Sequence, residues 1–519
     1  MKNTFKKFAG IAAASIMAAS MVAPMAMNFT ASAADTTITI KDGDSASTST
    51  FWGYLLMTAT DGGNGKFSYT VNEKYRAILK AEVGTTETDN AKIDDAIKAY
   101  IAGLTDADDM REFADDVYLA IKAAGIEKDE VSDKGVITGT QGYYLIAEKA
   151  LANTDTDGTM SLVMVDTLDN AGITVNVKKE TPKFEKKLKD KNDTTGVETG
   201  WQDGADYDIG DEVPFQLTAT LPQDYDKYQT YKLVFHDGME DNVFAFVEGS
   251  AKVTSGAIST AIVPTAGTCN ETISSGDVCE LEFTVDVKAT FPDAGPGDTV
   301  VIEYKATLED TANLGKAGNW NAAYLEYSNN PYYTGTGDTQ DEETMSETPK
   351  DQVVVFTYKT VINKVDGTDA NANPKPALAG AGFTLYKNIG GTWTEIKEIE
   401  ATETGTQFEF VGLDDGDYKL SETQTPQGYN TIADIEFTIT AEHDENNVDT
   451  PALKTLDGGN LATGDIDTGV ITAEVQNKSG TELPSTGGIG TTLFYLGGGA
   501  MVAVAGVYLI SKKRMKNED

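Results

Sequence analysis

Apolar and polar residues alternate with a period of two along most of the chain between residues 181 and 479. Successive side chains of a β-strand point to opposite faces of the sheet, so this period indicates strands with one buried face. The strand-like runs are short, and turn sequences such as Gly295-Pro296-Gly297 separate them. The pattern predicts a mainly β protein whose strands pack as Ig-like sandwiches.

The composition changes along the chain and suggests several domains. Residues 34–180 mix strand-like runs with two helical patterns, one capped by Asn90 and one running from near Thr105 to Gly125, which indicates an α+β domain. A stretch rich in Gly, Asp, Thr and Glu separates the two β-rich regions. We expect this order: 1–33 signal peptide, 34–180 α+β domain, 181–335 β-sandwich, 336–350 linker, 351–479 second β-sandwich, 480–519 C-terminal tail.

Both ends of the chain carry targeting signals. Residues 1–33 have a basic start, an apolar core and a small-residue cleavage site, Ala31-Ser32-Ala33, as in a secretory signal peptide. Near the other end, the uncharged apolar run 489–510 would span roughly 33 Å as a helix, enough to cross a bilayer. Basic residues follow it and would stay in the cytoplasm: Lys512, Lys513, Arg514 and Lys516. The sequence predicts an exported chain with a C-terminal transmembrane anchor.

Charge and motif content exclude several classes of function. The formal net charge of −41 would repel phosphate backbones, so we expect no nucleic-acid partner. The chain has two histidines and lacks HExxH, GxSxG, paired CxxC and P-loop motifs, so we expect neither an enzyme nor a cofactor. Cys269 and Cys279 are the two cysteines. Export favours a local disulfide between them, with free thiols as the alternative.

Residues 153–158 imitate the first half of a calcium-binding EF-hand loop. Position 12 of such a loop requires a bidentate Glu, and Met164 stands there instead. We expect a solvated hairpin turn here, with a weak calcium site as the alternative.

Polar residues interrupt the apolar strand faces in both sandwiches. In the first sandwich Lys186 shares a face with Phe184 and Leu188, and Asp237 and Asn321 occupy similar positions on two other strands. In the second, Lys364 ends the face of Val354, Phe356, Tyr358 and Ile362, Asn477 ends another face, and Glu422 lies beside Tyr418 and Leu420. Lys187 and Asn329 are neighbouring alternatives in the first sandwich. Buried groups of this kind are costly unless paired or consumed chemically.

A lysine, a carboxylic acid and an asparagine held together in an apolar core can form an intramolecular amide. Burial favours the neutral amine, which is the nucleophile, and the protonated acid, which polarises the carboxamide and shuttles protons as ammonia leaves. The fold supplies proximity, so neither a cofactor nor a partner enzyme is needed.

The tail Leu483-Pro484-Ser485-Thr486-Gly487, followed by the apolar run and basic cluster, resembles the cell-wall sorting signal of Gram-positive bacteria. The resemblance implies that the transpeptidase sortase cuts between Thr486 and Gly487 and transfers the Thr carbonyl to an amine. It also implies attachment to peptidoglycan.

Residues 418–429, with Tyr418, Leu420, Glu422 and then Pro426-Gln-Gly428-Tyr429, resemble the E-box of Cna-B domains. That resemblance implies an isopeptide bond between Lys364 and Asn477 with Glu422 as the catalytic acid. The first sandwich resembles the fimbrial isopeptide-forming domain, which implies a bond between Lys186 and Asn321 with Asp237 as the acid. A faint E-box echo occurs at residues 144–148, without a matching Lys and Asn.

The lysine-rich stretch 172–191 resembles the pilin motif, in which a Val-x-Val strand precedes the acceptor lysine, although its Tyr-Pro is missing. Lys179 is the expected intersubunit lysine, with Lys178 and Lys183 as rivals. As a whole the chain resembles a sortase-assembled major pilin, which implies sortase, other copies of itself, minor pilins and peptidoglycan as partners, and a host or community surface ligand. The alternative is a monomeric wall-anchored adhesin presenting its first domain on a β-stalk.

Overall fold

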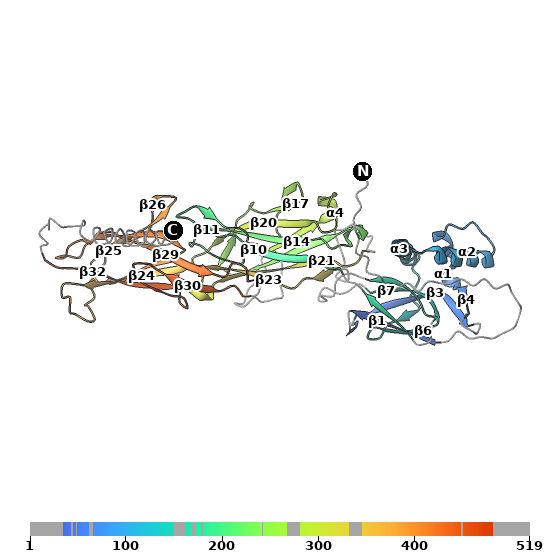
Figure 1. The fold of residues 1–519 in the computed structure, drawn as a ribbon. Helices are drawn as coiled ribbons and strands as arrows, with labels where there is room; N and C mark the ends of the chain where they lie inside the picture. Colours follow the sequence, from blue (N-terminus) through green and yellow to red (C-terminus); the bar gives the residue numbers. More distant parts are fainter. Residues whose placement is uncertain are drawn as a thin grey trace, which may run out of the picture.

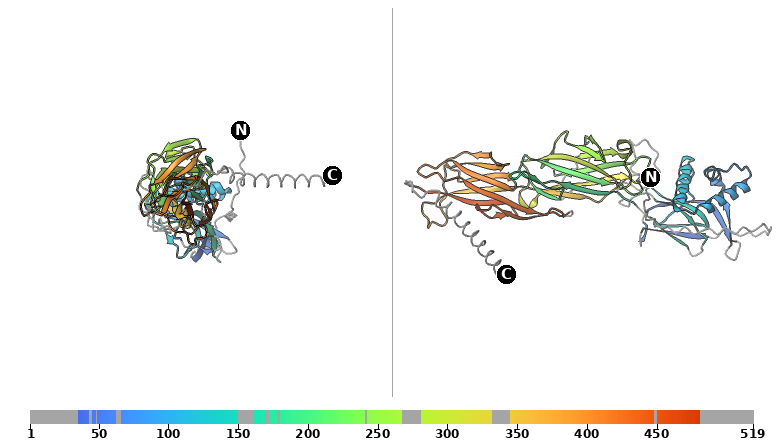
Figure 2. Two further views of the ribbon diagram at one scale, coloured as in Figure 1. Left: turned by 90° about the vertical axis from the view of Figure 1, so that its left-hand side faces the viewer. Right: turned by 45° about the horizontal axis from the view of Figure 1, so that its top comes forward.

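Three modules follow one another along the long axis of the molecule, and the three long helices belong to the first module (Figures 1 and 2). The structure is a computed structural model, which describes residues 35–42, 45–47, 49–61, 66–149, 161–168, 172–177, 180–240, 242–266, 281–331, 345–447 and 450–480. Strands make up most of the regular structure, so the prediction of a mainly β protein with an α+β N-terminal domain is confirmed.

The N-terminal module packs three helices on one of two small sheets. The sequence predicted α2 (Asn90–Gly103) and α3 (Ala107–Ala123) but missed α1 (Glu73–Glu82). Only Tyr75 and Leu79 of α1 are buried, so its apolar stripe is too short to stand out. The Asn72 side chain caps α1 by accepting from the Lys74 amide at 3.1 Å. The strands are β1 (Asp35–Asp42), β2 (Ser45–Ala46), β3 (Phe51–Asp61), β4 (Phe67–Val71), β5 (Glu130–Val131), β6 (Val136–Thr140), β7 (Gly142–Glu148), β8 (Leu162–Asp166) and β9 (Ile173–Val177).

The middle module is a sandwich of two sheets around one apolar core. One sheet has the order β10-β14-β20-β17-β18 with β16 beside β20, and the other has the order β13-β23-β21-β15-β19 with β22 beside β21. The elements are β10 (Lys183–Leu188), β11 (Lys191–Asn192), β12 (Val197–Glu198), β13 (Gly204–Asp206), β14 (Glu212–Thr220), η1 (Tyr225–Lys227), β15 (Lys232–Met239), β16 (Phe244–Phe246), β17 (Lys252–Ser255), β18 (Ile258–Ala261), β19 (Leu281–Asp286), α4 (Val287–Thr290), β20 (Thr299–Leu308), η2 (Gly315–Ala317), β21 (Asn319–Ser328), β22 (Met345–Glu347) and β23 (Asp351–Phe356).

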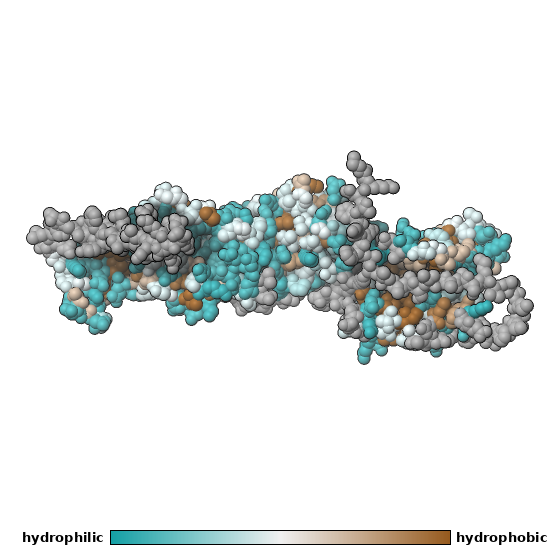
Figure 3. Space-filling view, viewed as in Figure 1, coloured by the Kyte–Doolittle hydropathy of each residue, from teal (hydrophilic) through white to brown (hydrophobic). Residues whose placement is uncertain are grey.

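The last module is a second sandwich. Its sheets have the orders β27-β24-β32-β31 and β26-β25-β28-β29-β30. The strands are β24 (Tyr358–Asp366), β25 (Gly382–Ile389), β26 (Thr392–Ile399), β27 (Gln407–Leu413), β28 (Gly416–Gln424), β29 (Ile435–His443), β30 (Leu453–Asp457), β31 (Gly464–Asp465) and β32 (Val470–Asn477). The surface seen in Figure 3 is mostly hydrophilic over these two sandwiches, as expected for strands that turn their apolar residues inward.

The boundary expected between residues 350 and 351 is wrong. β23 pairs with β21 and β13, so it belongs to the middle module, and β22, from the expected linker 336–350, also pairs with β21. Val353 and Val355 pack in the middle core, whereas Val354 and Phe356 pack in the last core. A strand buried on both faces has no polar face to identify its domain, which is why the sequence pattern misplaced it.

Several sequence predictions lie outside the described residues. These are the signal peptide, the residues 153–158 that imitate a calcium loop, the two cysteines, Lys178 and Lys179, and the sorting signal with its apolar run. Among the helices of the described part of the chain, none is both long and apolar enough to cross a membrane.

Candidate crosslinking sites

The first candidate site lies inside the last module, where Lys364 and Asn477 come from adjacent parallel strands. β24 and β32 pair so that Asp366 stands opposite Asn477 and Lys364 opposite Val475. Period-two alternation turns the Lys364 and Asn477 side chains into the core, and both are fully buried. The ends of the two strands thus bring an amine and a carboxamide together.

Glu422 completes this site from β28 in the facing sheet. The Lys364 amine contacts Asn477 Oδ1 and lies 3.1 Å from Glu422 Oε1. Asn477 Nδ2 donates to Glu422 Oε2 at 3.0 Å and to the Asn430 carbonyl, also at 3.0 Å. The three side chains predicted from the sequence therefore meet in direct contact.

Backbone and hydroxyl groups hold the Glu422 carboxyl in place. Its Oε2 accepts from the Ile432 amide at 3.1 Å and from Thr425 Oγ1 at 3.2 Å. The two donors flank the Pro426-Gln-Gly428-Tyr429 segment, Thr425 directly before it and Ile432 three residues after it. They hold the acid close to the lysine and the asparagine.

The environment of Lys364 favours a neutral amine. Burial lowers the pKa of Lys364, and the nearby Glu422 opposes this shift only partly. The Phe383 ring centroid lies 5.4 Å from the amine on the apolar side. A neutral amine in contact with a carboxamide oxygen and a carboxyl group is the arrangement that amide exchange requires.

The second candidate site connects the two sheets of the middle module. Lys186 is on β10 in one sheet, while Asp237 on β15 and Asn321 on β21 are in the other, and all three are fully buried. The Lys186 amine contacts Asp237 Oδ2. Burial lowers the pKa of Lys186 even though Asp237 opposes the shift.

Tyr304 on β20 is a member of this site that the sequence did not reveal. Its hydroxyl accepts from Asn321 Nδ2 at 2.8 Å and from the Lys186 amine at 3.3 Å. Tyr304 belongs to the alternating apolar face of β20, where a tyrosine looks like an ordinary core residue. The only available signal was a phenol at a fully buried position, since such hydroxyls usually have a partner.

One carboxyl oxygen and one amide oxygen of the middle site lack a hydrogen-bond donor. Among the described residues, neither Asp237 Oδ1 nor Asn321 Oδ1 has a hydrogen-bond partner. Buried polar atoms are rarely left in this state. The site therefore holds one carboxyl oxygen and one amide oxygen without hydrogen-bond partners, in the same buried cluster as the Lys186 amine.

The neighbouring alternatives lie elsewhere. Lys187 Nζ donates to Asp203 Oδ1 at 2.5 Å, and Asn329 Nδ2 donates to Ser346 Oγ at 2.8 Å. The alternation of β10 thus selects Lys186, and Asn321 rather than Asn329 reaches the site because Asn329 lies beyond the end of β21.

The two sites differ in which strands they connect. In the last module Lys364 and Asn477 lie on the first and last strands. In the middle module Asn321 lies on β21, and β22 and β23 follow it in the same sheet. Lys186 and Asn321 therefore do not join the first strand of the middle module to its last strand, which is β23.

In the N-terminal module, residues 144–148, which resemble part of an E-box, lie on the buried strand β7. Glu148 is fully buried on β7 and accepts from the Ser161 amide at 3.1 Å. The Tyr144 hydroxyl donates to the Thr140 carbonyl at 2.6 Å.

Two known protein families match the C-terminal part of the chain. Residues 359–482 match the SpaA family, described as a prealbumin-like fold domain. Residues 475–519 match the LPXTG cell wall anchor motif. The first match begins one residue after the start of β24 and thus supports the domain limit that the strand pairing gives.

Two relatives come from Streptococcus pyogenes. The trypsin-resistant surface T6 protein of serotype M6 is 25% identical over 268 residues, which are 41% of this chain and 48% of that protein, so the match spans about half the length of this curated relative. The solved structure of the T6 backbone pilin of serotype M6, described as a modular three-domain structure, superimposes with a TM-score of 0.51 at 17% identity, covering 86% of this chain and 98% of that one. The chain thus has the fold of a modular backbone pilin and carries an LPXTG cell-wall anchor.

Proposed function

We propose that this chain is the structural subunit of a covalent cell-surface pilus. Sortase would join Thr486 of one subunit to Lys179 of the next and would finally attach the polymer to peptidoglycan. The observation that carries the proposal is the contact of Lys364 with Asn477 and Glu422 in the core of a chain with a cell-wall anchor. A chain built to carry load along its length needs such internal crosslinks, whereas an ordinary sandwich does not.

The last module would crosslink itself by amide exchange. The neutral Lys364 amine attacks Asn477 Cγ, and the Glu422 carboxyl group polarises the carboxamide. The new bond joins Nζ to Cγ, the bond from Cγ to Nδ2 breaks, and the one proton lost by the neutral amine leaves with the Nδ2 amino group as ammonia. Glu422 returns to its starting state, so it acts as a catalyst.

The middle module would form the corresponding bond between Lys186 and Asn321. Asp237 takes the place of the glutamate, and the Tyr304 hydroxyl, which contacts both reacting side chains, orients the carboxamide. This bond would connect the two sheets, whereas the bond in the last module would connect two neighbouring strands of one sheet.

The two crosslinks would lie on the path of mechanical tension. In a polymer joined from Thr486 to Lys179, tension passes through the middle and last modules and bypasses the N-terminal module. The N-terminal module would then be free to serve as a spacer or as a contact surface for a host or community ligand.

An immunoblot of wall extract tests the polymer. Wild-type cells should give a ladder of high-molecular-weight bands, and Thr486→Ala and Lys179→Ala should each abolish it. Lys178→Ala and Lys183→Ala are matched controls from the same lysine-rich segment and should keep the ladder. If the ladder is lost only in one of these controls, the lysine replaced there is the acceptor instead of Lys179. A single band in wild-type cells would favour the monomeric adhesin and contradict the proposal.

A further inference from the structure

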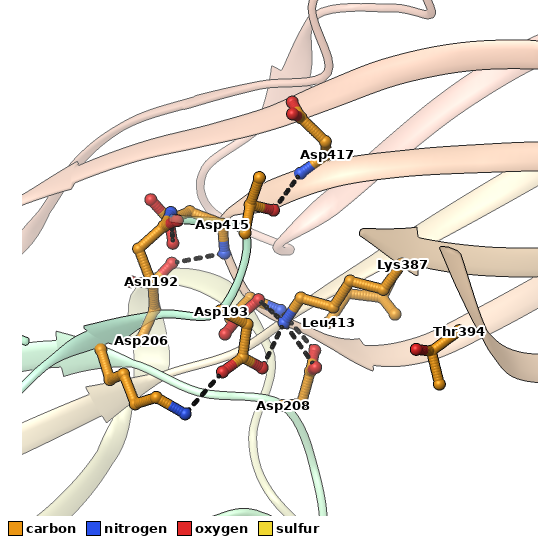
Figure 4. Close-up of polar contacts among 12 residues, drawn as sticks. Asn192, Asp193, Asp206, Asp208, Lys387, Thr394, Leu413, Asp415 and Asp417 are labelled. Atoms are coloured by element: carbon orange, nitrogen blue, oxygen red, sulfur yellow. Dashed lines mark hydrogen bonds and ion pairs between the residues drawn. The ribbon is translucent and has the colours of Figure 1, made fainter. Parts of the chain in front are cut away.

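A third buried lysine, Lys387 on β25, occupies the contact surface between the middle and last modules. Its amine lies 2.6 Å from Asp208 Oδ2 and 3.1 Å from Asp193 Oδ2, and it also contacts Asp414 (Figure 4). Asp193 and Asp208 belong to the middle module, whereas Asp414 lies between β27 and β28 of the last module. The Lys387 side chain is fully buried and thus ties the two modules together at their joint.

Further polar contacts surround this lysine and cross the same joint. Asn192 Nδ2 donates to Asp415 Oδ1 at 2.9 Å, and the Asp415 amide donates to Asp206 Oδ2 at 3.0 Å. On β29, His443 Nε2 lies 3.4 Å from Asp190 Oδ2 and 3.7 Å from Asp206 Oδ1. Asp414 Oδ2 is buried and has no hydrogen-bond partner among the described residues.

At the joint, acidic groups outnumber basic groups when all the elements that pack there are considered together. The carboxyl groups are Asp190, Asp193, Glu198, Asp206, Asp208, Asp211, Asp414, Asp415 and, at the exposed edge, Asp444. The basic groups are Lys191, Lys387 and His443, with Lys189 paired to Glu198, Lys454 paired to Asp444 and Lys316 paired to Asp467 at the edge, and the phenols are Tyr207, Tyr358 and Tyr418. Burial raises the pKa of five of these carboxyl groups, those of Asp190, Asp208, Asp211, Asp414 and Asp415.

A metal ion is the poorer explanation of this charge imbalance. The Lys387 amine already lies at the centre of the Asp193, Asp208 and Asp414 group, where a cation would have to bind. A covalent bond from Lys387 is also disfavoured. Burial lowers the pKa of Lys387, but Asp414 and Asp208 outweigh burial and raise it, so its amine remains an ammonium ion. This is the opposite of the shift at Lys186 and Lys364.

We propose that the joint between the middle and last modules is proton-linked: it takes up protons between pH 8 and pH 6 and holds the two modules together more tightly in the protonated form.

The direction of the effect follows from the buried acids and the histidine. Burial and the neighbouring Asp206 raise the pKa of Asp415 to about 7. Burial lowers the pKa of His443, but hydrogen bonds to Asp190 and Asp206 outweigh burial and raise it to about 10. Each group binds its proton more tightly in the closed joint than in water. Its stabilising contribution is therefore complete below its pKa in water and is lost as the pH rises through its pKa in the joint.

Hydrogen exchange of amides that bond across the joint tests the proposal. The Ile209 amide donates to the Gly412 carbonyl at 3.1 Å, and the Asp203 amide donates to the Glu445 carbonyl at 2.8 Å. Their protection factors in the purified protein, corrected for the intrinsic pH dependence of exchange, should rise at least about tenfold from pH 8 to pH 6 if a group of pKa near 7 closes with the joint. Protection that stays constant or falls on acidification would overturn the proposal.

Two variants separate the buried groups from ordinary surface charge. Asp415→Asn should reduce the rise in protection, because its amide does not titrate. Asp467→Asn is the matched control, since Asp467 pairs with Lys316 across the same joint but is exposed, and it should leave the rise intact. The wild-type pH profile remains decisive if Asp415→Asn fails to fold. A mass deficit of one water that disappears in Lys387→Arg would also overturn the proposal, since it would show a Lys387 amide.

Discussion

Lys364 and Asn477 lie on neighbouring parallel strands, and the amine of the first contacts the carboxamide oxygen of the second in a fully buried position. The chain separation between them is 113 residues, so a bond here would close almost the whole last module into a loop.

The intact mass of the secreted protein should be lower than the sequence mass by one ammonia for each crosslink. Two ammonias should be missing in the wild type. Glu422→Ala should restore one and Asp237→Ala should restore the other, because each removes the acid of one site. Mass spectrometry under denaturing conditions measures both. Glu436→Ala, an exposed glutamate on the next strand, should keep the wild-type deficit. An undiminished wild-type mass would contradict the crosslinks in both modules.

Lys364→Arg should destabilise the last module. In the chain-entropy treatment of crosslinks, closing a loop of this size stabilises the fold by about 4–5 kcal/mol. Arginine does not act as a nucleophile, so no amide can form at this position. Denaturant unfolding of the last module measures the loss of stability. Equal midpoints for wild type and variant would show that no bond forms.

An uncrosslinked Asn477→Ala protein should become more stable as the pH rises from neutral toward the usual pKa of lysine. Burial lowers the pKa of Lys364, so the folded state binds fewer protons there than the unfolded state. The contribution is unfavourable at neutral pH and fades as the pH rises toward 10.5. Comparison with Lys364→Met/Asn477→Ala, measured by denaturant unfolding across this range, isolates the lysine. Parallel pH profiles of the two proteins would show that the pKa of Lys364 is not lowered in the folded state.

Tyr304→Phe should slow or prevent crosslinking in the middle module only. The phenol hydroxyl is the group that contacts both Lys186 and Asn321, and without it the carboxamide loses its orientation. The mass spectrum should then show a mixture with one and two ammonias missing. Tyr231→Phe provides the control in the same core, because the Tyr231 hydroxyl has no hydrogen-bond partner among the described residues. A complete deficit in Tyr304→Phe would show that the hydroxyl is dispensable.

The sequence predicted the side chains of the two candidate sites better than the domain limits. Lys364, Glu422 and Asn477 could be found because a polar residue on an alternating apolar face stands out, and Lys186 and Asp237 for the same reason. Tyr304 could not be found, since an aromatic residue on an apolar face looks like packing. Lys387 was also missed: its burial depends on aspartates from another module, and no local pattern records such a contact.

β23 packs Val353 and Val355 into one core and Val354 and Phe356 into the other, and it lies between β13 and β21 in its sheet. The two sandwiches therefore cannot be cut apart cleanly at residue 350. A fragment ending there would leave a gap in the middle of a sheet and two exposed strand edges, and a fragment starting there would carry an orphan strand. A recombination event that transfers one of these modules to another surface protein would have to transfer both sandwiches together or cut the chain after residue 356.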